Sequence, residues 1–282
     1  MKKLLLCLIC LCANLQAQEV SIDSNYVNTI NSQTLQLRQQ GKYTEAIKLN
    51  DNLLSSFKGD TSSYYFAKTL HARSRVEIDL GTYDAAITSA KRSKVIYDRL
   101  NLKSEVAAME NIIGVGFYFK SQLDSTLYYY NRSYDLKKQF EKDTIQLAIS
   151  IFNIGIVHEN LGKYDKAIKT YHEAESLLNS TTEKAVFMSD LYVALSNLYR
   201  KRNNLYKARS YAQLALKESV EKYGEDILGD DALFLIGTIY EDRLNEKEKA
   251  KEVYRNFLIQ YPGSNKAAEA RKRFRTLRGD FL

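Results

Sequence analysis

The chain has 282 residues, with 41 Lys and Arg against 34 Asp and Glu, and a formal net charge of +7. It contains one proline, Pro262, and 12 glycines. This composition disfavours a fold of many short strands punctuated by proline and glycine, and it favours long helices.

The first residues have the pattern of an export signal. Lys2 and Lys3 precede an apolar run over residues 4–15, and Ala17 is a small residue suited to cleavage. We predict a signal peptide over 1–17 and a periplasmic or secreted mature chain, whose formal charge falls from +7 to +5 with the two lysines removed. The run is shorter than the roughly 20 apolar residues that span a bilayer.

A lipid-anchored form is the alternative, because all three cysteines of the chain lie in this segment. They are preceded by large apolar residues where a lipoprotein signal has a small one, which makes this alternative weaker: Cys7, Cys10 and Cys12 follow Leu6, Ile9 and Leu11. With this segment removed, the chain has no cysteine for a disulfide or a thiolate site.

An internal repeat covers nearly all of the remaining chain. One series of small residues recurs at intervals of 40, 40, 41, 41 and 42: Ala46, Ala86, Thr126, Ala167, Ala208 and Ala250. A second series keeps a spacing of 41: Gly114, Gly155, Ser196 and Gly237. Small residues at a fixed period predict pairs of antiparallel helices that cross closely.

The clearest copy starts at Asn153 and reads NIGIVHENLGKYDKAI, followed by Tyr171 and Ala174. It resembles a tetratricopeptide repeat, with a small residue in the first helix, Gly and Tyr at the turn, and Ala, an aromatic and Ala in the second helix. The resemblance implies an all-α, right-handed superhelical solenoid of about six helix-turn-helix repeats. The approximate repeats are 18–60, 61–102, 103–142, 143–180, 181–226 and 227–263 of a solenoid over 18–263.

Each unit is longer than the usual period of about 34 residues. A capping box at Ser180–Glu183 predicts a helix start near Thr181, well before Ser196. Asp143 and Ser104 stand similarly far before Gly155 and Gly114. We therefore expect the additional residues to lengthen each first helix, as in long-period variants of the family.

The last segment, 264–282, is predicted to be a capping helix and tail. Ala267, Ala270, Phe274 and Leu277 form one apolar seam, and the final repeat resembles those of bacterial envelope-assembly lipoproteins. Six basic residues accompany the seam: Lys266, Arg271, Lys272, Arg273, Arg275 and Arg278. They suit a solvated helix end, and the other interpretation is peripheral contact with an anionic envelope surface.

No catalytic, cofactor or metal motif stands out. His71, His158 and His172 lack metal-ligand spacing, and Gly114-Val115-Gly116 lies in a helical pattern and not after a strand. Six of the 21 tyrosines occupy repeat positions expected to pack, which argues against nucleic-acid stacking: Tyr43, Tyr83, Tyr130, Tyr164, Tyr171 and Tyr254. An enzyme with an unrecognised site is a remote alternative.

The resemblance places a groove on the first helices, where amides could pair with a peptide backbone and apolar neighbours accept its side chains. The candidate groove residues are Asn111, Tyr118, Phe152, Asn153, Ile156, Asn197 and Arg200, accompanied by Val115, Val193 and Phe234. The alternative is that some of them pack between repeats. The positions of a chaperone-type carboxylate clamp hold Asn31, Leu35, Lys68 and Ala72, which does not match that clamp.

The sequence therefore predicts a scaffold, and not an enzyme, that is exported to the bacterial cell envelope and binds a protein or peptide without a cofactor or nucleic acid. The alternative is a peptide sensor that acts with a separate transducer.

Overall fold

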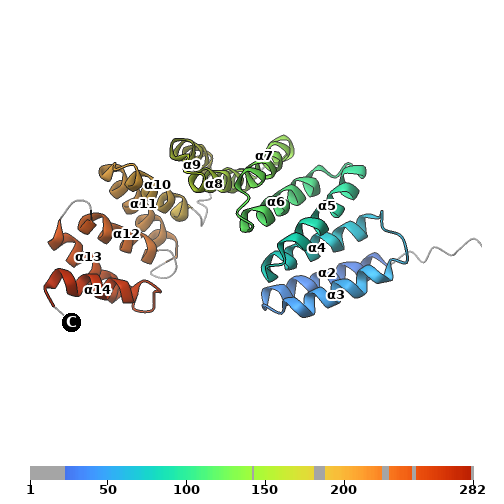
Figure 1. The fold of residues 1–282 in the computed structure, drawn as a ribbon, viewed down its shortest axis with the longest axis horizontal. Coiled ribbons are helices and arrows are strands. Elements are labelled where there is room, and N and C mark those ends of the chain that lie inside the picture. Colours follow the sequence, from blue (N-terminus) through green and yellow to red (C-terminus); the bar gives the residue numbers. More distant parts are fainter. Residues whose placement is uncertain (1–22, 142, 181–187, 224–228, 243–245, 281–282) are drawn as a thin grey trace, which may run out of the picture. The chain divides into compact units, whose positions relative to one another are not determined.

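The computed structural model describes residues 23–141, 143–180, 188–223, 229–242 and 246–280 (Figure 1). These residues form thirteen α-helices and no strand, which confirms the predicted all-α class. The chain divides into two compact units, Met1–Leu102 and Lys103–Leu282.

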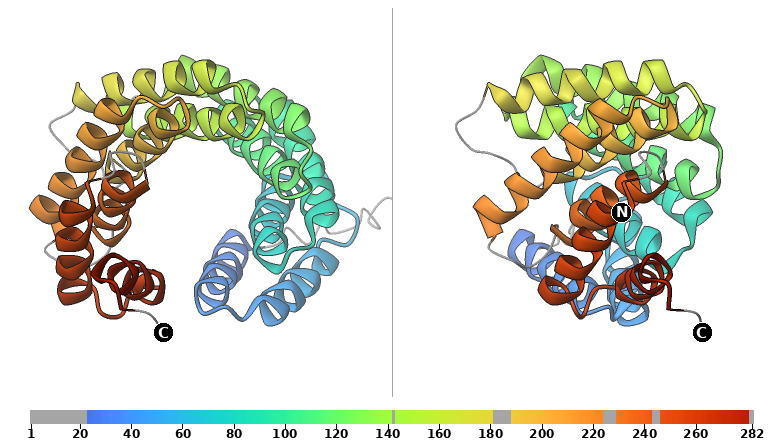
Figure 2. Two further views of the ribbon diagram at one scale, coloured as in Figure 1. Left: turned by 60° about the vertical axis from the view of Figure 1, so that its left-hand side comes forward. Right: turned by 90° about the vertical axis from the view of Figure 1, so that its left-hand side faces the viewer.

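Each unit is a stack of helix pairs, seen from two further directions in Figure 2. The first unit holds α2 (Ser24–Gln39), α3 (Tyr43–Ser56), α4 (Tyr64–Leu80) and α5 (Tyr83–Arg99). The second unit holds α6 (Lys103–Phe119), α7 (Leu123–Phe140), α8 (Thr144–Asn160), α9 (Tyr164–Asn179), α10 (Met188–Lys201), α11 (Leu205–Tyr223), α12 (Gly229–Asp242), α13 (Lys247–Gln260) and α14 (Ala267–Arg278).

Helices that are consecutive in the chain pack against each other within each unit, and first helices of neighbouring repeats also meet, as α2 does with α4 and α10 with α12. Each predicted repeat range contains one helix pair, and 264–282 contains α14. The arrangement is that of a helical-repeat solenoid.

Three repeats join their helices by placing a glycine against a tyrosine ring. A Cβ added to Gly155 would lie 2.3 Å from Cε1 of Tyr171, and one added to Gly114 would lie 2.5 Å from Cδ1 of Tyr130. Gly237 and Tyr254 repeat the pair, at 2.6 Å. Real Cβ atoms do not approach a ring this closely, so glycine is required wherever the second helix carries the tyrosine.

The fifth repeat has neither the glycine nor the tyrosine at these two positions. Ser196 stands at the glycine position and Ala212 at the tyrosine position, and both are fully buried. The hydroxyl of Ser196 donates a hydrogen bond to the carbonyl oxygen of Ala208 at 2.6 Å. A larger residue on the first helix is thus matched by a smaller one on the second.

In the first unit the equivalent positions hold small or polar residues. Asn50 Nδ2 donates to Oγ1 of Thr34 at 2.5 Å, and Ser74 and Ala90 are fully buried in the second repeat. The sequence of the second repeat has no glycine in its first helix, and the burial of Ser74 establishes its register.

The predicted turn glycines adopt the left-handed conformation that glycine tolerates. Gly41, Gly81 and Gly162 have φ angles of 73°, 82° and 70°. In the third repeat Ser121 takes this place, with φ of 58°. A side chain in this region is strained by about 1–2 kcal/mol.

Replacing Ser121 with glycine should therefore raise the free energy of unfolding by about 0.5–1 kcal/mol, since the relieved strain exceeds the extra entropy of an unfolded glycine. Urea denaturation followed by circular dichroism measures the change. The matched control is Ser104→Gly inside helix α6, which should be destabilising by a similar amount. Equal effects of the two substitutions would contradict the strain at Ser121.

The helix boundaries correct one expectation. The first helices α4, α6 and α8 each have 17 residues, and their partners α5, α7 and α9 have 17, 18 and 16. The two helices of each of these three repeats are therefore about equally long, so a lengthening of the first helix alone does not describe them. The last turns of α5 contribute Ile96 and Tyr97 to the core, so its apolar contacts extend that helix.

The capping predictions have separate outcomes. The side chain of Asp143 accepts hydrogen bonds from the backbone N–H groups of Ile145 and Gln146 and begins α8, as predicted. Helix α6 begins at Lys103, so Ser104 lies inside it and does not cap it, and the predicted start is wrong by two residues. The start near Thr181 lies outside the described residues, as does the signal segment 1–17.

Candidate functional site

A hollow in the second unit lies between the first helices of the last two repeats. Its volume is about 280 Å³, and its lining comes from α10, from α12 and from the residue before α14: Val193, Asn197, Arg200, Asp231, Phe234, Leu235, Thr238 and Lys266. Two predicted site residues, Asn197 and Arg200, line it, together with their expected neighbours Val193 and Phe234.

The hollow combines an apolar floor with side chains that donate and side chains that accept hydrogen bonds. Leu235 is buried and the ring of Phe234 is half-buried. An Arg200 Nη2 atom lies 3.5 Å from Oδ1 of Asn197, which is a long contact, so both groups keep hydrogen-bonding capacity for a ligand. The floor suits apolar side chains and the rim suits a polar backbone.

The sequence did not place Asp231 and Lys266 in the groove. Lys266 forms an ion pair with Asp231, and Ser264 Oγ donates to Oδ2 of Asp230 at 2.7 Å. These two contacts connect the start of the capping helix to α12. The repeat pattern could not indicate these contacts, because Lys266 follows the last repeat. In the sequence it is one of six basic residues near the capping helix, and nothing there places it beside Asp231.

Asp190, in the first turn of α10, has a carboxyl group with a raised pKa. Burial raises the pKa of its carboxyl group, and the negative charge of Asp231 raises it further. The ion pair of Asp231 with Lys266 offsets part of that repulsion.

The other five predicted groove residues lie half-buried on α6 and α8, and they do not line this hollow. Three of them take part in packing. The hydroxyl of Tyr118 accepts a hydrogen bond from Nδ2 of Asn160 at 3.0 Å, the ring of Phe152 lies 5.2 Å from that of Tyr171, and Ile156 packs against the core of the second unit. Asn111 and Asn153 remain predicted groove residues.

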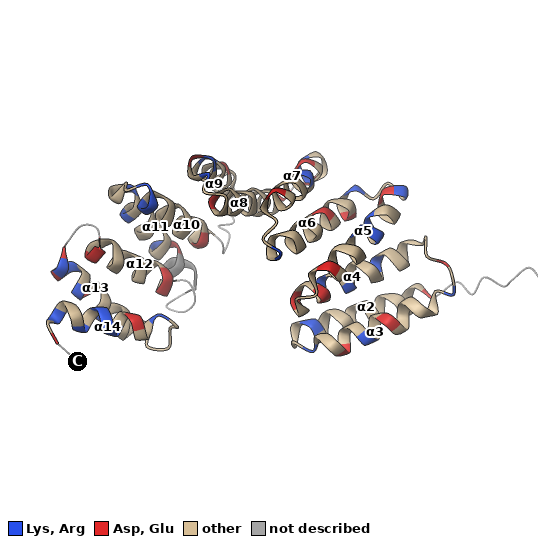
Figure 3. Cartoon of the chain, viewed as in Figure 1, with Lys and Arg blue, Asp and Glu red and all other residues tan. Residues whose placement is uncertain are grey.

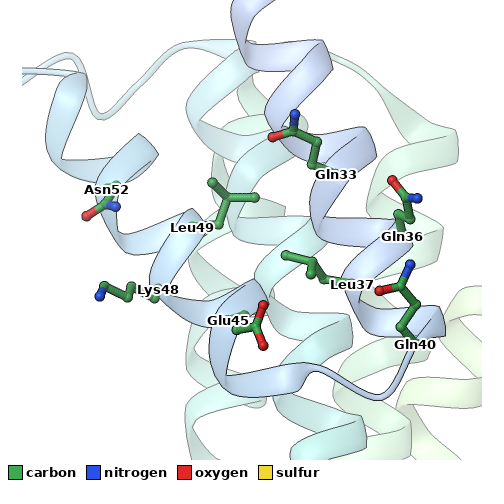
Figure 4. A pocket seen from close by; sticks show the side chains of 8 residues that line it. All are labelled: Gln33, Gln36, Leu37, Gln40, Glu45, Lys48, Leu49 and Asn52. Carbon is green, nitrogen blue, oxygen red and sulfur yellow. The ribbon is translucent and has the colours of Figure 1, made fainter.

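A further hollow of about 520 Å³ has a different character (Figure 4). It lies between α2 and α3, where Leu37 and Leu49 are surrounded by polar side chains: Gln33, Gln36, Gln40, Glu45, Lys48 and Asn52. Such a polar rim is expected on the outer face of a repeat at the end of a stack. We interpret this surface as a solvated face.

Basic positions lie along α14 (Figure 3), and acidic partners neutralise part of their charge. Arg273 pairs with Glu241 at 2.9 Å and with Asp242 at 3.0 Å, Arg278 pairs with Asp280, and Lys266 is held by Asp231. Arg273 and Lys266 thus connect the capping helix to α12, whereas the pair of Arg278 with Asp280 is local. The other three are exposed on the helix surface: Arg271, Lys272 and Arg275.

The three histidines lie on α4, α8 and α9. Nδ1 of His172 is 2.8 Å from Glu175, and Nε2 is 3.0 Å from the hydroxyl of Tyr199. Among the described residues, no group of three or more His, Cys, Asp or Glu is arranged to hold a metal ion. None of the described helices is long and apolar enough to span a membrane.

Burial lowers the pKa of His71, and together with the positive charges of Arg75 and Lys68 it brings that pKa to about 4. The unfolded chain therefore binds a proton on this residue at a higher pH than the folded chain does. The contribution of His71 to the free energy of unfolding should be complete above about pH 6.5. It should decrease by about 2–3 kcal/mol as the pH falls toward 4.

Urea denaturation between pH 7 and pH 4 measures this loss. His71→Gln should remove that part of the loss, whereas His158→Gln should remove less, because His158 is less buried. An unchanged pH dependence in His71→Gln would show that His71 is not held neutral by the fold.

Helix pairs stacked in chain order, with a hollow between neighbouring first helices, define a helical-repeat protein. Sequence profiles described as tetratricopeptide repeat match residues 148–177 and 231–264. These two segments are tetratricopeptide repeats within a helical-repeat chain. A comparison with curated proteins finds no significant match.

Solved structures of low sequence identity share the fold. A signal transduction ATPase with a tetratricopeptide-repeat sensor, from Pyrococcus horikoshii, has a TM-score of 0.75 and 17% identity over 89% of this chain. The match covers 39% of that protein, so this chain spans well under half of its length.

Two further structures are similar. The apo form of the quorum sensor NprR from B. thuringiensis has a TM-score of 0.68 and 13% identity, over 94% of this chain and 73% of that one. A Rap protein complexed with competence and sporulation factor has a TM-score of 0.56 and 16% identity, over 89% and 74%.

Proposed function

We propose that the chain is an exported scaffold of the bacterial cell envelope that binds a segment of another polypeptide along its first helices. The observation that carries this proposal is the hollow between α10 and α12, where Asn197 and Arg200 lie beside Val193, Phe234 and Leu235. An extended peptide needs backbone partners and apolar pockets side by side. The volume of about 280 Å³ is just below the range of about 300–1,000 Å³ of small-molecule sites, and it suits a few side chains.

The test is capture from envelope fractions of cells that produce the chain. The groove variant carries Asn197→Ala and Phe234→Ala, and the control carries Tyr206→Ala, a residue 74% exposed on the second helix α11. A polypeptide captured by the wild type and the control but lost from the groove variant supports the proposal. Equal capture by all three would contradict it.

Export is supported by the charged start, apolar run and small residue of positions 1–17. The expected mature protein begins at Gln18 and is recovered with the periplasm or the medium. Cell fractionation measures the location of the protein, and N-terminal sequencing determines its first residue. A cytoplasmic chain that retains Met1–Ala17 would refute export. The exposed cations of α14 are the remaining basis for a contact with an anionic envelope surface.

A second function is favoured by the solved structures. Two proteins of the same fold are described as sensors, so we also consider a sensor that binds a secreted peptide and acts through a separate transducer. Small-angle scattering with and without an added peptide that binds the groove distinguishes the two functions. A sensor predicts a change in the scattering curve on binding, and a passive scaffold predicts none.

A further inference from the structure

Helix α14 lies where the first helix of a further repeat would lie. It packs on α13 as α12 packs on α11, and it is the last helix of the described chain (Figure 1). Arg273 of α14 pairs with Glu241 of α12 at 2.9 Å. In the same way Lys201 of α10 pairs with Glu159 of α8 at 2.7 Å. Arg273 therefore occupies the place that Lys201 has on a first helix.

This equivalence sets the register of α14. The small residue of α10 lies five positions before Lys201, and five positions before Arg273 is Ala268. The residues one position before and two positions after the small residue are buried in the fourth, fifth and sixth repeats: Ile154 and Val157, Leu195 and Leu198, Ile236 and Ile239. Ala267 and Ala270 hold these two positions on α14 and are also buried.

The face of α14 that corresponds to the contact with a second helix is open. In complete repeats the small residue touches the second helix, as the three glycine–tyrosine pairs show. The residue three positions later faces that helix too, since the rings of Tyr199 and Tyr211 stack at 5.6 Å. On α14 the small residue, Ala268, is exposed, and no described helix covers it.

Three exposed cations surround this open position. Arg271, Lys272 and Arg275 come three, four and seven residues after Ala268, so the four residues share one side of the helix. None of the three cations forms an ion pair with a described residue. The open face of α14 is thus a small residue flanked by unneutralised positive charge.

The hydrogen-bonding character of this face is the reverse of that in complete repeats. Four positions after the small residue, the fourth and sixth repeats have Glu159 and Glu241, each of which accepts a hydrogen bond from a tyrosine hydroxyl of the second helix. The same position of α14 holds Lys272, and an ammonium group only donates. A helix on this face must therefore offer acceptors, and carboxylates also neutralise the cations.

We propose that the open face of α14, formed by Ala268, Arg271, Lys272 and Arg275, binds an acidic amphipathic helix of another polypeptide, which takes the place of a second helix. A small residue of that helix packs on Ala268, and carboxylates near its N-terminal end pair with the cations, where they also suit the helix dipole. None of the four residues lines the α10–α12 hollow, so this is a second binding surface beyond the proposed function.

A flat anionic lipid surface fits this face less well. Lipid headgroups would neutralise the cations, but they need no small residue among them. A docked helix does need one, because a large side chain at a helix crossing holds the two backbones apart. Substitution of Ala268 therefore distinguishes a helix from a lipid surface.

The probe is a peptide with the sequence of residues 203–218, since α11 is the second helix that carries an alanine, Ala212, at the contact position. Its acidic form has Asn204→Asp, Lys207→Glu and Arg209→Glu, and its basic form keeps the three residues. Position 207 is chosen because Lys207 lies over the ring of Tyr199, the counterpart of Arg271. Short helices are marginal in water, so a crosslink between positions 213 and 217 holds both peptides helical.

Fluorescence anisotropy measures binding of each peptide to the full chain. The acidic form should bind at least about tenfold more tightly than the basic form, and added salt should reduce the difference. Arg271→Gln and Lys272→Gln should each weaken binding of the acidic form by about threefold. The matched controls are Lys163→Gln and Lys169→Gln, exposed cations of the fourth repeat, which should bind like the wild type.

Ala268→Leu separates binding from folding. Because the position is exposed, the urea midpoint should equal that of the wild type. Binding of the acidic peptide should fall by about tenfold, since the larger side chain holds the peptide helix away from α14. A folded Ala268→Leu variant that binds the acidic peptide unchanged would overturn the inference.

The remaining outcomes are also decisive. Equal binding of the acidic and basic peptides, or binding of neither, would overturn the inference. Binding to phosphatidylglycerol vesicles that needs Arg271 and Lys272 but is unchanged in Ala268→Leu, with no binding of the acidic peptide, would identify a lipid contact instead. A dimer in sedimentation velocity that is lost in Ala268→Leu would identify a second copy of the chain as the occupant. These results leave the groove proposal intact, because its test uses Asn197 and Phe234.

Discussion

A serine substituted at Gly155 should lower the free energy of unfolding by about 3 kcal/mol. The new Cβ would lie 2.3 Å from Cε1 and 2.5 Å from Cδ1 of Tyr171. The ring cannot move aside easily, because Tyr171 is fully buried between neighbouring helices. Overpacking against a fixed ring forces the two helices of the repeat apart.

The fifth repeat shows how the loss can be reduced. There the chain has Ser196 with Ala212 at the same two positions, both buried. Tyr171→Ala alone should cost about 3–5 kcal/mol through the cavity it leaves. The double variant should be more stable than the sum of the two single effects predicts, by about 2 kcal/mol.

Urea denaturation of the four proteins of this double-mutant cycle gives the coupling energy. The matched cycle is Ser196→Gly with Ala212→Tyr, which converts the fifth repeat to the glycine–tyrosine form and should also show positive coupling. Additive effects in both cycles would contradict the view that the two positions are chosen together.

The second large effect concerns the capping helix. Ala270→Asp should destabilise the sixth repeat by about 3–5 kcal/mol, because it buries a carboxylate without a partner. Ala270 is fully buried among Tyr254, Phe257 and Tyr261. The exposed Ala268, two residues earlier in the same turn of α14, receives the same substitution as a control and should change stability little.

Hydrogen exchange measured by mass spectrometry shows where the loss occurs. Peptides from α13 and α14 should lose protection in Ala270→Asp, while those from α2 and α3 keep it, since each repeat of a solenoid contacts its neighbours only. Similar exchange in Ala270→Asp and Ala268→Asp would show that α14 does not cap the core.

The helix pairs could be predicted from the sequence because close helix crossings restrict residue size at fixed positions. Gly155 and Tyr171 are recognisable for that reason. The lengths of the individual helices could not be predicted, because burial of residues such as Tyr97 extends the second helices and depends on contacts that the repeat pattern does not contain.

The candidate site was predictable only in part. Asn197 and Arg200 lie one turn apart on a first helix, so the repeat pattern places them together on its exposed face. Lys266 comes from outside the repeats, and local sequence could not show that it lines a hollow.

Photocrosslinking in cells that produce the chain shows most directly whether the first helices hold another polypeptide. A photoreactive amino acid is placed at Phe234 in the α10–α12 hollow, and separately at Tyr206 on the exposed side of α11. We predict a discrete polypeptide adduct at position 234 that is absent at position 206 and is lost when Asn197→Ala is added. An adduct only at 206, or the same adducts at both positions, would contradict it.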